Sequence, residues 1–362
     1  MQNLRIPGPT PCPEEVLKAM GQQMINHRGP EMAAIMKEVA EKLKYFFQTK
    51  NDVLVLTGSG TGGLEAAAVN FLSPGDTVLS VSIGVFGERF AKIASIFGAK
   101  IIALNFEQGK AADPALVKKA LTEHPEIKAV LVTHNETSTG ITNDLKPLAS
   151  VIKGAGKLLL VDAISSLSSI NLPVDEWGCD VVVSGSQKGW MVPPGLAFIS
   201  VSPEAWKANA ESKMPRFYWD LAKHKASIEK GQTPWTPCVS VIVALHTALI
   251  MMEKEGMQNI FKRHQKIADF TRKGVKELGL TLLAEEKYAS NTVTAIVATE
   301  GLDVKKLLKI MREEYNTVLA GGQGPLEGKI FRIGHLGWVT ENDIKVTLDN
   351  LKLALPKAGF RS

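Results

Sequence analysis

Cysteine is scarce in this sequence. The 362 residues contain three cysteines, Cys12, Cys179 and Cys238, which lie far apart along the chain. An odd number at such spacing fits neither a disulfide framework nor the closely paired cysteines of a zinc site. We therefore expect no structural metal and no disulfide scaffold, and a reducing cytoplasm as the natural location.

Long apolar runs are also missing. The longest apolar tract, residues 239–252, is interrupted by Ser240, His246 and Thr247, and it falls short of the ~20 apolar residues that a membrane span requires. The first 13 residues contain four prolines and no apolar stretch of the signal-peptide type. We expect a buried helix at 239–252, no membrane partner and no export.

Charge of either sign is never concentrated. The chain has 42 basic and 37 acidic residues, a net charge of +5, with no dense Lys/Arg block and no aromatic and basic stripe. This balance gives no support for a nucleic-acid partner and only weak support for an anionic substrate. Apolar residues make up 45% of the chain, which is ample for packed cores, and the length suggests about two domains.

Short apolar runs alternate with helical patterns over the first 200 residues. Expected strands are 53–56, 77–81, 100–104, 129–133, 158–161, 181–184 and 196–200, and expected helices are 62–71, 88–97, 114–123 and 145–153. This alternation predicts an α/β fold in which helices cover both faces of a mostly parallel sheet.

The pattern changes beyond about residue 205. A long periodic stretch at 239–278 precedes a tail in which we expect strands at 292–298 and 329–333 and helices at 304–315 and 341–355. We therefore expect a large domain over 15–250 and a smaller α+β domain over 251–362, which the amino-terminal segment 1–14 joins.

Two charged residues stand at the ends of neighbouring apolar runs. Asp162 ends Leu-Leu-Leu-Val-Asp, and Lys188 follows Val-Val-Val-Ser-Gly-Ser-Gln. Carboxyl ends of parallel strands meet at one rim, where open α/β sheets bind ligands. A lysine amine can form a Schiff base with pyridoxal phosphate, and a carboxylate can keep the cofactor's pyridine nitrogen protonated. The pair therefore indicates pyridoxal phosphate chemistry, although each residue alone has a simpler interpretation, a solvated loop lysine and a helix N-cap.

A glycine-rich segment follows the first expected strand. Its Gly-x-Gly-x-x-Gly pattern is that of dinucleotide-binding folds and comprises Gly58, Gly60 and Gly63. The acidic residue expected roughly 20 positions later is absent, which argues against a nicotinamide-dependent dehydrogenase. Free amides of Gly60, Thr61 and Gly62 at a helix start would suit any phosphate. We interpret the segment as a cup for the cofactor phosphate, with a tight structural turn as the alternative.

Several motifs resemble those of class V aminotransferases of fold type I, and most of all alanine–glyoxylate and serine–pyruvate aminotransferases. The motifs occur in the family's order and cover nearly the whole chain: 57–67, Gly-Val-Phe-Gly-Glu-Arg at 84–89, Thr-His-Asn-Glu-Thr-Ser-Thr-Gly at 133–140, 160–167, Ser-Gly-Ser-Gln-Lys at 184–188 and Phe-Arg-Ile-Gly at 331–334. The resemblance implies a seven-stranded-type sheet in the large domain.

The resemblance also assigns roles around the cofactor. It implies that Lys188 carries the cofactor and shuttles the substrate proton, and that Asp162 pairs with the pyridinium. It places Phe86 on the ring face, although a core phenylalanine is the alternative. Thr137 corresponds to the residue that binds the phenolic oxygen, and Gln187 lies near the ring. Ser59 belongs to the matched glycine-rich motif and joins the phosphate cup.

Further residues are implied for the substrate and for a second subunit. Arg332 corresponds to the arginine that holds the substrate α-carboxylate, with a surface ion pair as the alternative, and Gly8 is placed beside the substrate. Thr233 and Thr236 resemble residues that reach the phosphate of a neighbouring subunit, which implies a homodimer with shared active sites. His27 and Arg28, near the expected entrance, have no assigned role.

The implied reaction is a ping-pong transamination between a small amino acid, alanine or serine, and a small 2-oxo acid, glyoxylate or pyruvate. Aspartate or phosphoserine stays open as a substrate, since Arg28, Arg216, Lys213 or Lys223 could enter the pocket. A cysteine desulfurase is disfavoured because no cysteine follows Cys238. A non-catalytic partner subunit of a larger complex is the remaining alternative.

Overall fold

A seven-stranded sheet forms the centre of the protein, as a computed structural model describes it for residues 2–360. Its order is β2-β10-β9-β8-β5-β3-β4, with β10 antiparallel to both neighbours and the other pairs parallel. The strands are β2 (Asp52–Gly58), β3 (Thr77–Ser82), β4 (Lys100–Asn105), β5 (Ile127–Thr133), β8 (Leu158–Asp162), β9 (Val181–Gly185) and β10 (Gly195–Val201). The predicted mostly parallel sheet is confirmed.

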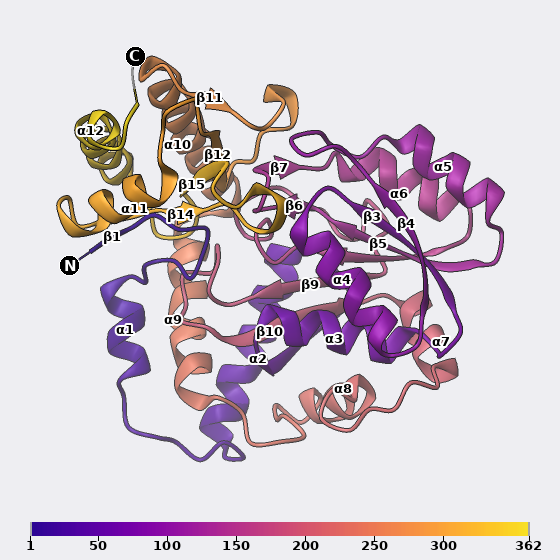
Figure 1. Cartoon of the computed structure of the whole chain (residues 1–362). Coiled ribbons are helices and arrows are strands. Elements are labelled where there is room, and N and C mark those ends of the chain that lie inside the picture. Colours follow the sequence, from indigo (N-terminus) through magenta and orange to yellow (C-terminus); the bar gives the residue numbers. More distant parts are fainter. Residues whose placement is uncertain (1, 361–362) are drawn as a thin grey trace.

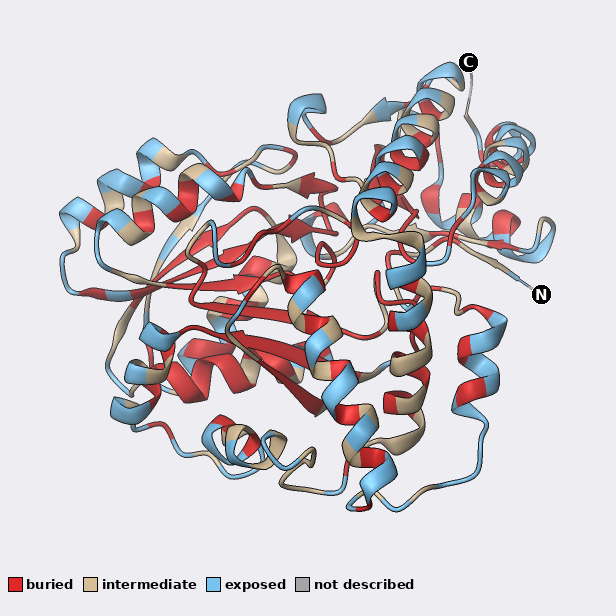
Figure 2. Ribbon diagram, turned by 180° about the vertical axis from the view of Figure 1, so that it is seen from behind, coloured by how far each residue is buried: buried red, intermediate tan, exposed pale blue. Residues whose placement is uncertain are grey.

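Helices cover both faces of this sheet (Figure 1). They are α2 (Pro30–Phe47), α3 (Gly60–Phe71), α4 (Val85–Ile96), α5 (Pro114–Glu123), α6 (Leu145–Gly154), α7 (Pro203–Glu211), α8 (Leu221–Ile228) and α9 (Val239–Glu255). Successive strand residues point to opposite faces. Leu54 and Val183 pack with α3 and α4 in one core, whereas Val55 and Val182 pack with α2 and α9 in the other. The inner strands are therefore buried on both sides (Figure 2), whereas the edge strand β4 has only exposed and half-buried residues.

A second, antiparallel sheet with order β11-β12-β15-β14 lies in the carboxyl-terminal part. Its elements are α10 (Met257–Glu277), β11 (Thr281–Leu282), β12 (Val293–Val297), α11 (Val304–Glu313), β13 (Thr317–Val318), β14 (Ala320–Gly321), β15 (Ile330–Gly334) and α12 (Glu341–Lys357), with short 3-10 turns at Glu286–Tyr288 and Gly324–Leu326. The amino-terminal strand β1 (Asn3–Leu4) pairs with β13. Strand β1 and helix α12 lie on the same side of the molecule (Figure 1), and the Asn3 side-chain amide donates to Asp343 O in α12 at 3.2 Å.

The domain division stays a prediction, although one detail bears on its boundary. Helix α9 continues through residue 250 to Glu255, and Gly256, with a φ of 84°, separates it from α10. The long periodic stretch is therefore two helices. Helix α1 (Glu14–Met20), which packs against α9, was not anticipated. Within residues 2–360, no helix has the length and apolar character needed to cross a membrane.

Candidate active site

A pocket of about 250 Å³ opens at the carboxyl ends of the parallel strands. It brings together nine of the residues selected from the sequence: Gly8, Ser59, Gly60, Thr61, Phe86, Thr137, Asp162, Gln187 and Lys188. Asp162 is the last residue of β8, and Lys188 follows β9, its neighbour in the sheet. Parallel pairing therefore delivers the two charges to one rim, as the sequence predicted.

Lys188 is enclosed by the amino-terminal segment. Its ammonium donates a hydrogen bond to the Pro7 carbonyl. A Cβ on Gly8 would lie 2.6 Å from Lys188 Nζ, and Gly8 has a φ of +113°, so only glycine fits there. Burial lowers the pKa of Lys188 to about 8, and the positive charges of Arg332 and Arg89 act in the same direction against the opposing effect of Asp162. A solvated loop lysine is not what the structure shows.

Asp162 is 4% exposed. Burial raises its pKa to about 7 and the charge of Glu136 adds to this, while the hydrogen bond from Ile164 N–H and the charges of Lys188 and Arg89 act to lower it. Its Oδ1 accepts that local bond at 3.0 Å. Residues 164–169 form turns and no helix, so the alternative of a helix N-cap does not hold. Its Oδ2 has no hydrogen-bond partner among residues 2–360 and is available to a cation in the pocket.

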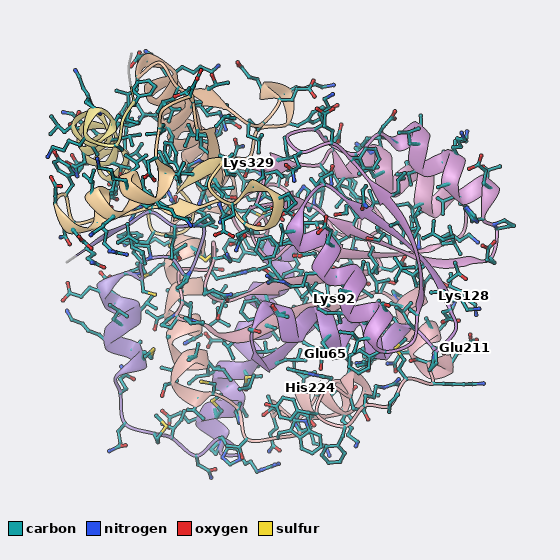
Figure 3. The ribbon with its side chains drawn as sticks, viewed as in Figure 1. Glu65, Lys92, Lys128, Glu211, His224 and Lys329 are labelled. Carbon is teal, nitrogen blue, oxygen red and sulfur yellow. The ribbon has the colours of Figure 1, made fainter. Side chains whose placement is uncertain are left out.

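The glycine-rich segment forms the start of α3. Ser59 is the N-cap, and its Oγ accepts the Gly62 N–H at 3.3 Å. Gly62 lies outside the pocket, and a Cβ there would be 2.9 Å from the ring of Trp219. The prediction of a free Gly62 amide is therefore wrong, because this N–H donates to the Ser59 side chain. Trp219 is held by a bond from its Nε1 to Glu65 Oε1 of 2.9 Å, and Figure 3 labels Glu65 on α3.

The amides of Gly60 and Thr61 do not take part in any hydrogen bond that the described chain provides. Both residues line the pocket at the positive end of the α3 dipole. This arrangement suits a phosphate group. The expected cup stays a prediction, and its candidate groups are the amides of Gly60 and Thr61 and the hydroxyl groups of Ser59 and Thr61.

Phe86 and Arg89 project into the pocket from the first turns of α4. Phe86 is half-buried and lines the pocket, so it is not a core phenylalanine under the sheet. The Arg89 guanidinium lies 4.6 Å from the Phe86 ring centroid, within cation–π range. Arg89 has no ion pair with any carboxylate of residues 2–360. No role for Arg89 was predicted from the sequence, although Arg89 ends the matched Gly-Val-Phe-Gly-Glu-Arg motif.

Arg332 extends from β15 of the small sheet and is 5% exposed. Its Nε donates to Gly321 O at 2.9 Å, and its Nη1 donates to Thr137 O at 2.8 Å and to Gln323 Oε1 at 3.4 Å. Burial lowers its pKa to about 10, against the charge of Glu136. No carboxylate within the described chain pairs with it, so the alternative of a surface ion pair does not hold.

Other residues selected from the sequence lie elsewhere. Thr233 and Thr236 do not line this pocket, and the Thr233 hydroxyl donates to Trp235 O at 2.6 Å. Arg28 is exposed and donates to Gln232 Oε1 at 3.4 Å, while His27 is half-buried outside the pocket. Arg216, Lys213 and Lys223 are also outside it. The pocket residues that the sequence did not suggest are Leu64, Arg89, Asn135, Ile164, Ser165 and Gln323.

A larger hollow of about 850 Å³ lies beside α10 and holds none of the selected residues. Three of its four lining cations are paired: Arg272 with Asp269 at 2.6 Å, Lys273 with Glu277 at 3.8 Å and Lys276 with Glu286 at 2.5 Å. The fourth, Lys287, lies over the Tyr288 ring with its Nζ 4.9 Å from the centroid. The smaller pocket has the opposite character. It presents an amine, a free carboxylate oxygen, helix-terminal amides, an aromatic ring and a buried Gln187 Oε1 without a partner. These groups fit the donor set that pyridoxal phosphate requires.

Comparisons with known proteins agree with this chemistry. The family model described as aminotransferase class-V matches residues 3–327. The soluble hydrogenase 42 kDa subunit of Anabaena cylindrica is 47% identical, over 99% of this chain and 94% of that protein. The serine–glyoxylate aminotransferase of Methylorubrum extorquens is 35% identical, over 99% and 92%. The crystal structure of alanine–glyoxylate aminotransferase from Nostoc sp. has a TM-score of 0.95 at 30% identity, covering 98% of this chain and 95% of that one.

Proposed function

Because this chain belongs to the class V aminotransferase family and is a pyridoxal phosphate-dependent transaminase, we propose that it transfers the amino group of alanine or serine to glyoxylate or pyruvate. The observation that carries the proposal is the surroundings of Arg332. This buried guanidinium has no carboxylate partner in residues 2–360, and its neighbour on the pocket side is the neutral Gln323. Under this proposal Arg332 alone binds a carboxylate, as suits a small monocarboxylate, and Arg89, which also lines the pocket, packs against the Phe86 ring.

Bound pyridoxal phosphate supplies an aldehyde that condenses with amines and a ring that accepts electrons from the substrate α-carbon. Lys188 is the group that moves the proton. Its pKa of about 8 leaves part of the amine neutral near neutral pH, where a general base works well. Asp162 Oδ2 would hold the ring nitrogen, and a cation there stabilises the ionised carboxylate despite its burial.

The remaining pocket residues would bind and orient. Thr137 and Phe86 both line the pocket. The Thr137 hydroxyl would donate to the phenolic oxygen, and Phe86 would stack on the ring. Ser59, Gly60 and Thr61 would hold the phosphate at the start of α3. Arg332 would hold the α-carboxylate through parallel hydrogen bonds, with Gly8 beside it. This set of roles is our proposal for the residues selected from the sequence.

We further propose a homodimer in which Thr233 and Thr236 reach the partner's phosphate site. Two observations support it. Both threonines lie outside the pocket of their own chain. Near them, Phe217 stacks on Trp235 with ring centroids 4.8 Å apart, although Phe217 is 69% exposed. An exposed aromatic cluster of this kind is typical of a protein interface. Light scattering of the purified protein tests the dimer, and a mass of one chain would contradict it.

The test of the substrate assignment is a spectral half-reaction. The protein is purified with pyridoxal phosphate, single amino acids are added, and conversion of the cofactor to its pyridoxamine form is followed by absorbance. We expect alanine or serine to convert it, and the Lys188→Ala variant to remain unconverted. Conversion by aspartate or phosphoserine alone would overturn the small-substrate assignment.

Aspartate is the second candidate, and a specific observation favours it. Arg89 is a pocket-lining cation without a carboxylate partner in the described chain, and L-aspartate–glyoxylate aminotransferase of Paracoccus denitrificans is 36% identical over 93% of this chain. Arg89→Leu discriminates the two assignments. It should abolish activity with aspartate if Arg89 binds a second carboxylate, and it should leave the preference for alanine over aspartate unchanged under our primary proposal.

One relative is named as a subunit of a soluble hydrogenase. This name suggests an alternative function, that of a subunit in a larger complex. Lys188, Asp162 and Arg332 form no ion pair within residues 2–360 and are available to ligands. Their presence supports catalysis in this chain. The half-reaction described above decides the matter for catalysis, because a subunit without activity would convert no amino acid.

A further inference from the structure

Glu136 is a buried carboxylate beside the active site to which the proposed mechanism gives no role. It ends the short strand β6 (Asn135–Glu136), which pairs with β7 (Ile141–Thr142), and it is 0% exposed. No cation of residues 2–360 lies within ion-pair distance of it. A buried charge without a cation is costly unless hydrogen bonds satisfy it. The arrangement around Glu136 therefore requires an explanation.

Four hydrogen bonds satisfy this carboxylate. Oε2 accepts the backbone N–H groups of Phe86 at 3.0 Å and Gly87 at 3.2 Å, both in the first turn of α4. Oε1 accepts Ser138 N–H at 3.0 Å and Ser138 Oγ–H at 2.7 Å. The start of a helix favours negative charge. Glu136 thus does the work of an N-cap for α4, although it comes from a segment 50 residues further along the chain.

Gly84 leaves the space that this cap needs. Gly84 is the residue before α4 and has no side chain to cap it. A Cβ at Gly84 would lie 2.5 Å from Ser138 Oγ and 2.7 Å from Glu136 Cγ. Ser138 Oγ also accepts the Val85 N–H at 3.1 Å. Glu136, Ser138 and the first turn of α4 therefore form one packed unit, which we call the Glu136 cap.

The Glu136 cap touches both halves of the active site. Phe86, whose amide it binds, faces the proposed cofactor position. Thr137, which lies between the two capping residues, lines the pocket, and its carbonyl accepts the Arg332 Nη1–H at 2.8 Å. The charge of Glu136 also raises the pKa of Arg332 against the effect of burial. One carboxylate is thereby connected to the groups proposed for the ring and for the substrate.

We propose that Glu136 is a positioning residue that holds Phe86, Thr137 and Arg332 as one unit and so fixes the cofactor ring relative to the substrate carboxylate. The inference rests on the roles proposed above for these three residues. It goes beyond them, because it assigns a function to a group that does not line the pocket.

The main test is Glu136→Gln. Glutamine has nearly the same size, but its NH2 group must face either the Phe86 and Gly87 amides or Ser138. Because the Ser138 hydroxyl can also accept, at least one hydrogen bond is lost together with the negative charge. We expect the dissociation constant for pyridoxal phosphate, measured by titrating the apoprotein, to rise about tenfold or more. We also expect the pH at which the visible absorption of the bound cofactor changes to shift downward, because a negative charge near a protonated group has been removed.

Three further variants separate charge from geometry. Ser138→Ala removes two hydrogen bonds but no charge, and Gly84→Ala pushes a methyl group against Ser138 and Glu136. Both should weaken cofactor binding, the first by about threefold, without the shift in the absorption profile. Glu88→Gln is the matched control, because Glu88 is exposed on the same turn of α4. It should leave both measurements unchanged.

Thermal unfolding of each apoprotein distinguishes positioning from mere structural support. If Glu136→Gln lowers the melting temperature but leaves the cofactor dissociation constant and the absorption profile as in the wild type, the proposal is overturned. If Glu136→Gln does not fold, unchanged cofactor binding in both Ser138→Ala and Gly84→Ala overturns it equally. Failure of the proposed substrate assignment would appear differently, as a wild-type protein that binds the cofactor but does not convert alanine or serine.

Discussion

The two hollows of this protein differ in how their charges are satisfied. The larger one beside α10 has about three times the volume of the other, yet Arg272, Lys273 and Lys276 each pair with a carboxylate. The smaller one, at the rim of the central sheet, contains Lys188 and Asp162, whose pKa values are shifted by burial, and Arg89, which has no ion pair within residues 2–360. Uncompensated charge costs folding free energy, so its concentration marks the functional site better than size does.

Replacing one lysine in each hollow should give the largest difference in activity. Lys188→Ala removes the amine that binds the cofactor and moves the proton, and we expect transaminase turnover to fall by at least about 10³-fold. Lys276→Ala removes an exposed ion pair with Glu286 and should leave turnover unchanged. Steady-state assays with alanine and glyoxylate measure both. Comparable losses in the two variants would contradict the assignment of the site.

The arginines provide the next largest difference. Arg332→Leu removes two parallel charge-assisted hydrogen bonds of ~1.5–3 kcal/mol each, so kcat/KM should fall by roughly 10²–10⁴-fold. Arg272→Leu, in the larger hollow, should leave kcat/KM near the wild-type value, because its partners are Asp269 and the Ser290 carbonyl. A wild-type KM in Arg332→Leu would show that another group binds the carboxylate.

Asp162 should give the apoprotein a distinctive pH dependence. Its folded pKa of about 7 lies above the ordinary value of 3.8. The folded state therefore holds this proton more tightly than the unfolded state, and stability falls as the pH rises from about 4 to about 7. Asp162→Asn should remove that part of the decline. Urea unfolding of the two apoproteins across this range measures it, and parallel pH profiles would be the contrary result.

The smallest expected effect concerns two helical glycines. Gly62→Ala would bring a methyl group to 2.9 Å from Trp219 at the phosphate cup, and we expect about threefold to tenfold weaker cofactor binding. Gly154, at the end of α6, has open space around it, so Gly154→Ala should leave cofactor affinity unchanged. Apoprotein titrations measure both. Equal affinities in the two variants would mean that Trp219 yields to the added methyl.

Much of the fold could be predicted from the sequence, because the central strands are local features. The strands at 77–81 and 181–184 and the helix at 114–123 follow from β-branched runs, apolar periodicity and a proline at a helix start. Helices α1, α2, α7 and α8 were not predicted. Short helices such as α1, α7 and α8 have weak local signals, whereas α2 spans 18 residues and its apolar periodicity was available in the sequence. The position of Gly256 inside the long periodic stretch marks its division into α9 and α10, and that signal was available.

Only part of the pocket could be predicted in the same way. Lys188 and Asp162 were found because each ends an apolar run, and the motifs of a known family supplied Phe86, Thr137 and Arg332. Gln323 was missed because its importance depends on its distance from Arg332. Gly62 was expected to offer a free amide, but Ser59 accepts its N–H and Trp219 covers it from a segment 157 positions away.

The sequence by itself determined the strands, the rim at which they end and the reactive pair at that rim, since each depends on neighbouring residues and on the rule that parallel strands end together. The tertiary structure alone decided which charges would be left unpaired. Glu136 caps α4 from 50 residues away, and Arg332 reaches Thr137 from the small sheet. The Pro7 carbonyl accepts a hydrogen bond from the Lys188 ammonium. Such contacts join segments far apart in the chain, so they depend on packing geometry, which no local pattern contains.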